Sequence, residues 1–206
     1  MAGVSTPRRR LTKEQRRGQL LDTAESLFSE VGYEPTTMED IARAAGVTRA
    51  VVYAHFDSKE QVLRSGVERA QAELEARLTD LTAPAAAGLP LPEILERGGD
   101  IFFSLLENTP SRWALMFAPA LAGPGRTADH FTALRRATIM RIADIGEHMQ
   151  SSVSSEQIEA VAYMISGVGE QLGRWWLNHP DVPRATVVSH YRDFILHGIA
   201  PLTEAR

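Results

Sequence analysis

The side chains best suited to bind another molecule lie in one short segment near the N-terminus. Residues 36–60 read TTMEDIARAAGVTRAVVYAHFDSKE, and a single short helical pattern within them carries Arg49, Tyr53 and His55. An Arg guanidinium can donate two hydrogen bonds to a guanine edge, and a Tyr hydroxyl can reach a phosphate. These residue types fit recognition of a nucleic acid, with a core Tyr and a helix-capping His as the alternative interpretation.

A second group of polar side chains precedes that segment. Between Arg8 and Arg17 there are six basic residues against one acid, whereas residues 61–206 hold 13 basic and 17 acidic residues, which accounts for the net charge of −4. This asymmetry fits an arm that contacts phosphates through Arg8, Arg9 and Arg10. A solvated tail that keeps the chain in solution is the alternative.

No arrangement of residues indicates catalysis. The 206 residues contain no cysteine, which excludes disulfides, thiolate zinc sites and cysteine nucleophiles. Gly167, Gly169 and Gly173 fall within a helical pattern and not after a strand, so they do not form a dinucleotide-binding loop. Ser and His residues are present, but no motif places them together. We therefore predict a protein that is not an enzyme and uses no cofactor.

Metal binding and membrane insertion are not indicated either. His190 and His197 share one face of a predicted helix, but no paired carboxylate lies at short spacing, so we expect no metal site there. The basic N-terminus is followed by no apolar segment, and the later apolar stretches are broken well before about 20 residues. We expect a soluble, cytoplasmic protein that does not contact a membrane.

Apolar residues recur at helical spacing along the chain, and no stretch alternates as a strand would. Thr12, with Gln15 three residues later, predicts the start of a first helix, and Gly32 predicts its end. We interpret the stretch TAPAAAGLPLP as a connection. The chain is thus predicted to be all-α, with domains over residues 1–56 and 57–206. Further helices are predicted over about 37–45, 48–55, 57–81, 91–107, 110–119, 127–150, 155–178 and 184–199.

Residues 37–55 predict a helix, a turn and a second short helix. Thr37 can cap the first helix, Gly46 ends it, and Thr48 can cap the second. This is the plan of a helix-turn-helix, whose second helix enters the major groove of DNA. The small and apolar residues between Ile41 and Val52 would pack the pair against the first helix. The opposite face keeps Arg49, Ala50, Tyr53 and, in part, His55.

The segment TTMEDIARAAGVTRAVVYAHFDSKEQVL, at residues 36–63, resembles the DNA-binding signature of the TetR-like transcriptional repressors. The match covers about residues 15–63 and includes the spacing of Gly46, Tyr53, Phe56 and Lys59. The resemblance implies three N-terminal helices for DNA, a helical ligand-binding core and dimerisation through the last two long helices. It implies DNA contacts at Thr37, Thr48, Arg49, Ala50, Tyr53, His55 and Lys59.

Two apolar stripes near the C-terminus are candidates for that dimer interface. Along residues 158–175 apolar side chains recur at alternating steps of three and four, and a similar stripe runs through residues 187–199. Two glycines in the first stripe would let another helix approach closely. Burial of both stripes within one subunit is the alternative. The predicted interface consists of Ile158, Val161, Ile165, Val168, Gly169, Leu172, Gly173, Trp175, Tyr191, Phe194 and Ile195.

The middle helices hold aromatic and Met residues that could line a ligand pocket. A plain core is the alternative for each of them. A helical carrier of hydrophobic ligands would also explain these helices, but it would leave residues 36–60 without a role. The predicted ligand-binding residues are Phe102, Phe103, Leu106, Trp113, Met116, Phe117, Phe131, Met140 and Glu170.

Together these features predict a ligand-responsive transcriptional repressor. We expect a homodimer that binds a palindromic operator in double-stranded DNA and is released by a hydrophobic or aromatic small molecule. If this effector is cationic, Asp144, Glu147 or Glu170 is the expected counter-charge.

Overall fold

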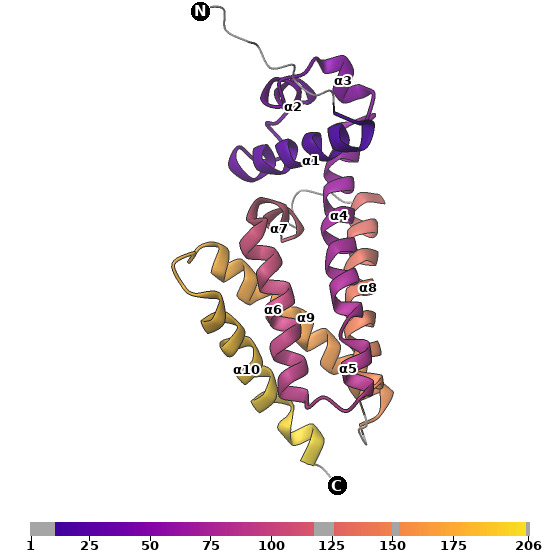
Figure 1. Ribbon diagram of the computed structural model, residues 1–206, viewed down its shortest axis with the longest axis vertical. Helices are drawn as coiled ribbons and strands as arrows, with labels where there is room; N and C mark the ends of the chain where they lie inside the picture. Colours follow the sequence, from indigo (N-terminus) through magenta and orange to yellow (C-terminus); the bar gives the residue numbers. More distant parts are fainter. Residues whose placement is uncertain (1–10, 118–125, 150–152, 205–206) are drawn as a thin grey trace, which may run out of the picture. The chain divides into compact units, whose positions relative to one another are not determined.

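The computed structural model describes residues 11–117, 126–149 and 153–204, and within these ranges the regular elements are α-helices without a β-strand (Figure 1). This confirms the predicted all-α fold. The chain forms two compact units that divide between Gly66 and Val67. The helices are α1 (Lys13–Glu30), α2 (Met38–Ala44), α3 (Arg49–Tyr53), α4 (Lys59–Thr79), α5 (Thr82–Ala86), α6 (Leu91–Asn108), α7 (Pro110–Met116), α8 (Arg126–Glu147), α9 (Ser155–Leu177) and α10 (Arg184–Glu204).

The first two helices begin at the caps that the sequence predicts. Thr12 and Gln15 form a capping box at the start of α1, with Gln15 N donating to Thr12 Oγ1 at 3.2 Å. Thr37 and Asp40 form a second box at the start of α2, with Asp40 N donating to Thr37 Oγ1 at 3.2 Å. Each box satisfies two backbone N–H groups that a helix start otherwise leaves unpaired.

The next two helices begin differently from the prediction. In the described part of the chain the Thr48 side chain makes no capping hydrogen bond to α3. At the start of α4 the cap is Ser58 and not Asp57, because Ser58 Oγ accepts from Gln61 N at 3.1 Å. Asp57 takes part through its backbone N–H, which donates to the Gln61 side chain. Asp57 and Glu60 also stand at capping spacing in the sequence, but the side-chain cap forms one residue later, between Ser58 and Gln61.

A tight turn joins α2 to α3 in the first unit. Gly46 has a φ of +66°, a left-handed conformation that other residues rarely adopt. The turn is closed by Val47 N, which donates to Ala42 O at 2.9 Å. Gln19 of α1 donates to Ala45 O at 3.3 Å, so the end of α2 is tied to α1. The turn fixes how α3 leaves α2, as a helix-turn-helix requires.

The core of the first unit is built by α1, α2, α3 and the start of α4. Apolar side chains from all four helices are buried, and Arg17 covers one of them by placing its guanidinium 4.8 Å from the centre of the Phe56 ring. Arg17 also donates to Ser65 Oγ at 2.8 Å. The most deeply buried apolar residues are Leu20, Leu21, Ala24, Ile41, Val52, Phe56, Val62 and Leu63.

A short helix, α5, lies within the stretch TAPAAAGLPLP, so the prediction that this whole stretch is a connection is wrong. Pro84 is tolerated because it lies in the first turn, where a helix does not need its N–H. The neighbouring Ala residues favour helix, and Leu81 and Ala85 are buried. Tertiary burial thus fixes a helix that the Pro and Gly content conceals.

In the second unit α6 packs against α10, and α8 packs against α9 (Figure 1). Phe103 of α6 is fully buried, with its ring centre 5.8 Å from that of Trp176 and 5.7 Å from that of Tyr191. Ion pairs add to the apolar contact between α6 and α10. Arg184 pairs with Asp100 at 3.0 Å, and Arg192 pairs with Glu96 at 2.9 Å. Helices α6 and α10 are therefore joined by both apolar and ionic contacts.

None of the helices in the described residues combines the length and the apolar composition needed to cross a bilayer.

The contact between α6 and α10 gives a testable prediction through two adjacent glycines. A Cβ atom on Gly99 would lie 2.9 Å from Cδ1 of the buried Tyr191, whereas one on Gly98 would lie 3.6 Å from Leu81 Cδ1, an ordinary contact. We expect Gly99→Ala to lower the free energy of unfolding by about 1 to 3 kcal/mol, because the ring has to move. Gly98→Ala should be neutral or stabilise by up to about 1 kcal/mol. Denaturant unfolding measures both, and equal effects would contradict the packing described.

Candidate functional site

The exposed face of α3 carries an Arg and a Tyr that contact each other. Arg49 Nη2 donates to Tyr53 Oη at 3.2 Å, and the guanidinium lies 5.2 Å from the centre of the Tyr53 ring. Both side chains are exposed, as are Thr48 and Ala50. Val52, on the opposite side of the helix, is completely buried. The helix therefore presents donors to solvent on one face and anchors itself to the core with the other.

An acidic residue also contacts this face. Glu39, in the first turn of α2, places Oε2 3.8 Å from Arg49 Nη1, and both side chains are well exposed. Exposed pairs of this kind contribute at most about 1 kcal/mol, so a stronger anionic partner can displace Glu39. In the first turn of α2, Glu39 is also favoured by the helix dipole. Its pairing with Arg49 depends on the turn that brings α2 beside α3.

His55 follows α3, and its Nδ1 is buried without a hydrogen-bond partner among the described residues. Burial lowers the pKa of His55, and the charges of Lys13, Arg17 and Arg16 lower the pKa further. The basic residues at the start of α1 therefore act on the end of α3. The sequence interpretation counted these charges but did not assign Lys13 or Arg16 to the site.

Lys59 has partners within the first unit. Its Nζ donates to Tyr33 O at 2.8 Å and to Glu34 O at 3.0 Å, and it lies 4.3 Å from the centre of the Tyr33 ring. A positive charge at a helix start is opposed by the helix dipole and needs negative groups nearby to offset it. In the structure two carbonyl oxygens do this, and Lys59 holds the loop before α2.

Thr37 donates its hydroxyl to Asp40 Oδ2 at 2.6 Å as part of the capping box. These hydrogen bonds from Thr37 lower the pKa of Asp40. Thr37 is exposed beside the start of α2, although its hydroxyl already caps that helix. Arg8, Arg9 and Arg10, the predicted phosphate-contacting arm, lie outside the described residues.

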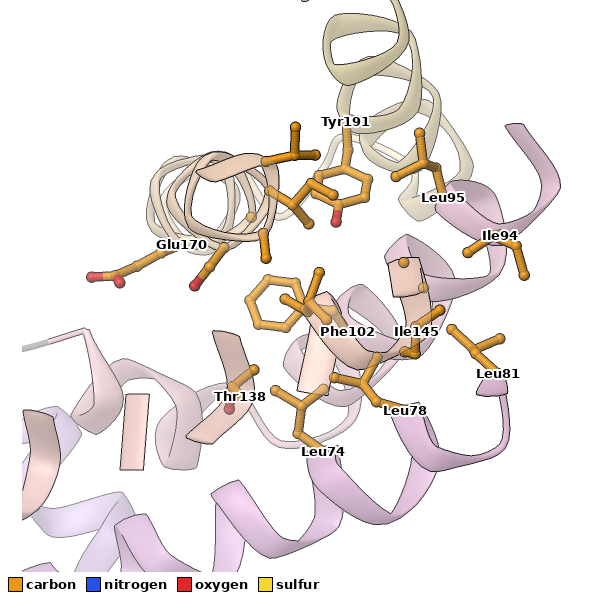
Figure 2. A pocket seen from close by; sticks show the side chains of 18 of the residues that line it. Leu74, Leu78, Leu81, Ile94, Leu95, Phe102, Thr138, Ile145, Glu170 and Tyr191 are labelled. Carbon is orange, nitrogen blue, oxygen red and sulfur yellow. The ribbon is translucent and has the colours of Figure 1, made fainter. Parts of the chain in front are cut away.

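The second unit contains a cavity of about 610 Å³ (Figure 2). Six of the nine predicted ligand-binding residues line it: Phe102, Trp113, Met116, Phe117, Phe131 and Glu170. Most of the lining is nevertheless aliphatic and comes from α4, α6, α8 and α9. The sequence interpretation missed this part, which includes Leu74, Leu78, Leu81, Ile94, Leu95, Ile142 and Ile145.

Three predicted ligand-binding residues are not part of the cavity lining, which corrects the prediction. Phe103 is enclosed by the rings of Trp176 and Tyr191. Leu106 is buried beside Gly173, where a Cβ atom would lie 2.8 Å from Leu106 Cδ2. Met140 is half-buried and does not line the cavity. For Phe103 and Leu106 the plain-core alternative is the right one.

The acidic residues considered as counter-charges have basic partners or lie at the surface. Glu170 pairs with Arg135 at 3.2 Å and with Arg174 at 3.0 Å. Asp144 pairs with Arg141 at 2.9 Å. Glu147 is exposed and does not line the cavity. Only Glu170 among them reaches the cavity, and its charge is already compensated.

The apolar stripe on α9 faces mainly its own subunit. Ile158, Val161 and Ile165 line the cavity, and Val168 and Leu172 pack against the buried core. Both glycines of the stripe serve contacts within the chain: Gly169 faces Phe102 and Tyr191, and Gly173 faces Leu106 and Phe117. The predicted close approach of another subunit at these glycines is therefore replaced by approach of α6, α7 and α10. Tyr191 and Ile195 of α10 are also buried.

The comparisons with known proteins agree with this architecture. Residues 20–65 match the family model of bacterial regulatory proteins, tetR family. The HTH-type transcriptional activator FasR of Mycolicibacterium smegmatis is 24% identical over 178 residues, which are 86% of this chain and 80% of FasR. IcaR of Staphylococcus epidermidis, the biofilm operon icaADBC HTH-type negative transcriptional regulator, is 42% identical over 50 residues, 24% of this chain and 27% of IcaR.

A solved structure extends the comparison to the whole fold. The fatty acid degradation regulator FadR from Bacillus halodurans matches with a TM-score of 0.73 and 15% identity, over 96% of this chain and 99% of that one. Residues 20–65 are therefore similar in sequence to the tetR family of bacterial regulatory proteins, and the chain has the fold of a TetR-like transcriptional regulator. FasR and IcaR are both transcriptional regulators.

The second unit leaves large apolar side chains exposed on its last two helices. The exposed fractions are 46% for Tyr163, 50% for Met164 and 39% for Trp175 of α9, and 67% for Phe194 of α10. Trp175 also stacks on His179, with ring centres 4.6 Å apart. Exposed apolar side chains of this size on two adjoining helices are typical of an interaction surface. Trp175 and Phe194 are the two predicted interface residues that are exposed.

The depressed pKa of His55 gives a prediction for the stability of the regulator. A histidine whose pKa is lower in the folded than in the unfolded state binds fewer protons when folded, so stability is complete above about pH 6.5 and falls as the pH drops below it. We expect the thermal midpoint to decrease between pH 8 and pH 5.5 by less in His55→Gln than in the parent. If the thermal midpoint of His55→Gln falls with pH as much as that of the parent, His55 is not the cause of the pH dependence.

Proposed function

We propose that the protein is a ligand-responsive repressor that binds a palindromic operator as a dimer and leaves it when a hydrophobic or aromatic small molecule binds. The exposed Arg49 and Tyr53 of α3, in a unit that matches the tetR family model, carry the DNA-binding part of this proposal. The apolar cavity in the second unit supports the ligand-responsive part. In this proposal residues 1–56 bind DNA, and residues 57–206 bind the ligand and dimerise.

The α3 face supplies the base contacts, and its surroundings supply the phosphate contacts. Arg49 can reach a guanine once DNA displaces Glu39, and Tyr53 donates to a phosphate. Lys13 and Arg16 join the phosphate contacts because their charges act at His55, beside the end of α3. The remaining proposed contacts are Thr37, Thr48, Ala50, His55, the third donor of Lys59, and Arg8, Arg9 and Arg10.

Dimerisation spaces the two recognition helices for DNA. They must lie about 34 Å apart, or near a multiple of it, to enter successive major grooves on one face of the duplex. A two-fold axis through the dimer makes the operator a palindrome. We place the interface on the exposed side chains Tyr163, Met164, Trp175 and Phe194, because the inward part of each stripe is already buried in its own subunit.

The direction of regulation differs between the two relatives, since IcaR is a negative regulator and FasR an activator. We propose repression, as for IcaR. A reporter gene placed behind an operator selected from the organism's own DNA tests this choice. Lower expression with the protein present supports repression, and higher expression would make the protein an activator.

The pairing of Arg49 with Glu39 yields opposite predictions for two substitutions. Arg49→Ala should weaken binding to the selected operator by about 1 to 3 kcal/mol and relax specificity at one position. Glu39→Gln should leave affinity unchanged or raise it by up to about 1 kcal/mol, because it removes a competitor of the DNA. Both Kd values are measured at one salt concentration. Equal Kd values for Arg49→Ala and the parent would exclude Arg49 as a base contact.

The exposed side chains of α9 and α10 predict a variant that cannot dimerise. Phe194→Glu places a charge where the proposed interface buries apolar surface, so we expect monomers and at least about a tenfold loss of operator affinity. Val31→Glu is the control, because Val31 is an exposed apolar residue of the first unit. Sedimentation over a range of concentrations measures the assembly. A dimer of unchanged strength in Phe194→Glu would place the interface elsewhere.

A further inference from the structure

The polar side chains that line the cavity lie apart from most of its aliphatic side chains. In Figure 2, Thr138 and Glu170 lie on one side of the Phe102 ring, while Leu81 and Ile94 lie on the other. The Leu and Ile side chains at that end offer no hydrogen bonds, whereas Tyr191 adds a hydroxyl to the lining. A molecule that fills the cavity must therefore be apolar along most of its length, with its polar group at the other end.

The charged groups in the lining already compensate one another. Arg135 and Glu170 are the ionised residues that line the cavity in the described part of the chain. They pair with each other at 3.2 Å, and Arg174 binds the same carboxylate at 3.0 Å. A cationic ligand group would lose its hydration without gaining an unpaired counter-charge, and an anionic one would have to compete with Glu170 for the two guanidiniums. The cavity therefore favours an uncharged ligand.

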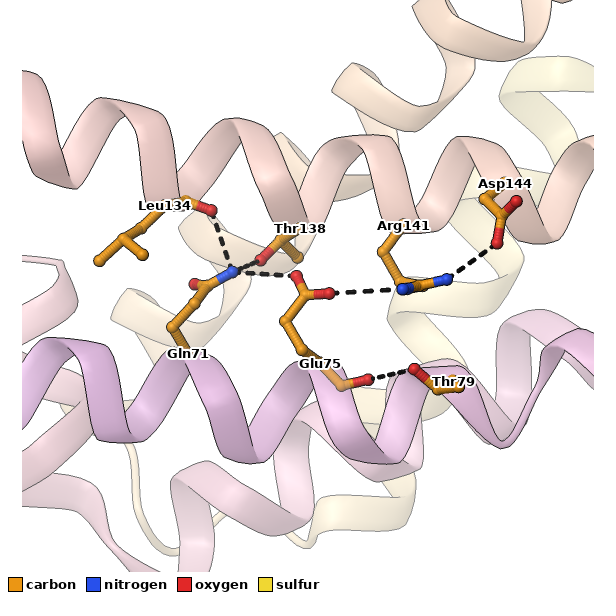
Figure 3. A network of polar contacts seen from close by, with 7 residues as sticks. All are labelled: Gln71, Glu75, Thr79, Leu134, Thr138, Arg141 and Asp144. Atoms are coloured by element: carbon orange, nitrogen blue, oxygen red, sulfur yellow. Dashed lines mark hydrogen bonds and ion pairs between the residues drawn. The ribbon is translucent and has the colours of Figure 1, made fainter.

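Gln71 lines the same cavity and is only 4% exposed (Figure 3). Its Nε2 donates to Leu134 O at 2.9 Å and to Glu75 Oε1 at 3.0 Å, and it also contacts Thr138 Oγ1. Exchanging the two ends of the amide would place its oxygen against a carbonyl and a carboxylate oxygen, so the contacts fix the orientation. This leaves Gln71 Oε1, a buried acceptor, without a partner among the described residues.

Within the described part of the chain Trp113, another residue of the cavity lining, has an unpaired hydrogen-bond donor, whereas Gln71 has an unpaired acceptor. Trp113 is 1% exposed, and its Nε1 is a buried donor for which the described residues supply no acceptor. Buried polar atoms in folded proteins almost always have hydrogen-bond partners, and each one left unpaired reduces stability. A ligand that donates to the first atom and accepts from the second, as a hydroxyl group can, would satisfy both.

We propose that the effector is an uncharged, mainly aliphatic molecule with a hydroxyl group that donates to Gln71 Oε1, and with an oxygen that accepts from Trp113 Nε1. The proposal rests on the proposed function in one respect only, namely that this cavity is the effector site. Gln71 is then the residue that determines specificity for a donor. The aliphatic lining accepts a straight or branched chain without specific contacts.

Four probes of equal chain length test this chemistry on the full chain. Decanol has the donor and the acceptor, decyl methyl ether lacks the donor, decanoate carries a negative charge and decylamine a positive one. Titration calorimetry should show decanol binding about tenfold more tightly than the ether, which leaves the acceptor of Gln71 unpaired. Decanoate and decylamine should bind more weakly than decanol. Equal or tighter binding of either ion, or no binding of decanol, would overturn the proposal.

Substitutions then identify the residue that accepts the hydrogen bond from the ligand. The quantity compared in each variant is the ratio of the Kd for the ether to the Kd for decanol. Gln71→Met keeps the length of the side chain and removes the acceptor, so the preference for decanol over the ether should disappear. Ser166→Ala removes another polar group from the lining and should keep the preference. Trp113→Phe should weaken both neutral probes alike. If Gln71→Met still binds decanol more tightly than the ether, the hydroxyl of decanol donates to another residue. The role proposed for Gln71 is then wrong.

Operator release is measured separately, so that the two proposals can fail independently. Decanol binding that depends on Gln71 supports the ligand chemistry, whatever happens to the DNA complex. If the bound alcohol does not raise the Kd for the operator, the ligand-responsive function fails for this ligand class. If an ion releases the operator and binds more tightly than decanol, the function stands and the ligand chemistry is wrong.

Discussion

The open cavity is the constraint on which the second unit depends. Apolar side chains on either side of a void lose the contacts that would otherwise hold their helices together. Helices α4 and α8 are joined beside the cavity by polar contacts, in which Gln71 binds Leu134 and Glu75 pairs with Arg141 at 3.6 Å (Figure 3). On the other side α6 and α10 are held by close packing at Gly99 and by ion pairs. The polar contacts preserve the space that the apolar ones would close.

The first unit solves a different problem, because its site is a surface and not a cavity. Its core is filled by buried apolar side chains, and the hydrogen-bond donors of α3 are exposed to solvent. Arg49 is meanwhile held by Tyr53 and Glu39, which limits the rotamers it must give up on binding. Under the proposed function the same contacts compete with DNA, so they hold Arg49 in place before binding but lower its net affinity for DNA. Lys59, in contrast, contributes by fixing the loop before α2.

Features set by local chemistry could be predicted from the sequence, whereas features set by tertiary neighbours could not. The capping boxes at Thr12 and Thr37 involve residues three apart, so the sequence contains both partners. The stripe on α9 has one spacing whether it faces its own core or another subunit, and only the fold shows that Val161 faces inward. Sequence also cannot separate a cavity wall from a core, which is why Phe103 and Phe102 received the same prediction. The unpaired oxygen of Gln71 depends on three acceptors, one of them within its own helix and two far along the chain.

Under the proposed function, the distribution of similarity along the chain follows from what each unit binds. The family model matches residues 20–65, within the first unit, while the whole-chain match to FadR retains the fold at 15% identity. B-DNA presents the same groove and phosphate spacing to every regulator, so the helices that fit it keep similar caps, turns and core residues. A cavity lined by aliphatic side chains tolerates exchange among Leu, Ile and Val as long as its volume is maintained. Ligand chemistry must therefore be argued from the few buried polar atoms of the lining, because the apolar residues around them can vary without changing the fold.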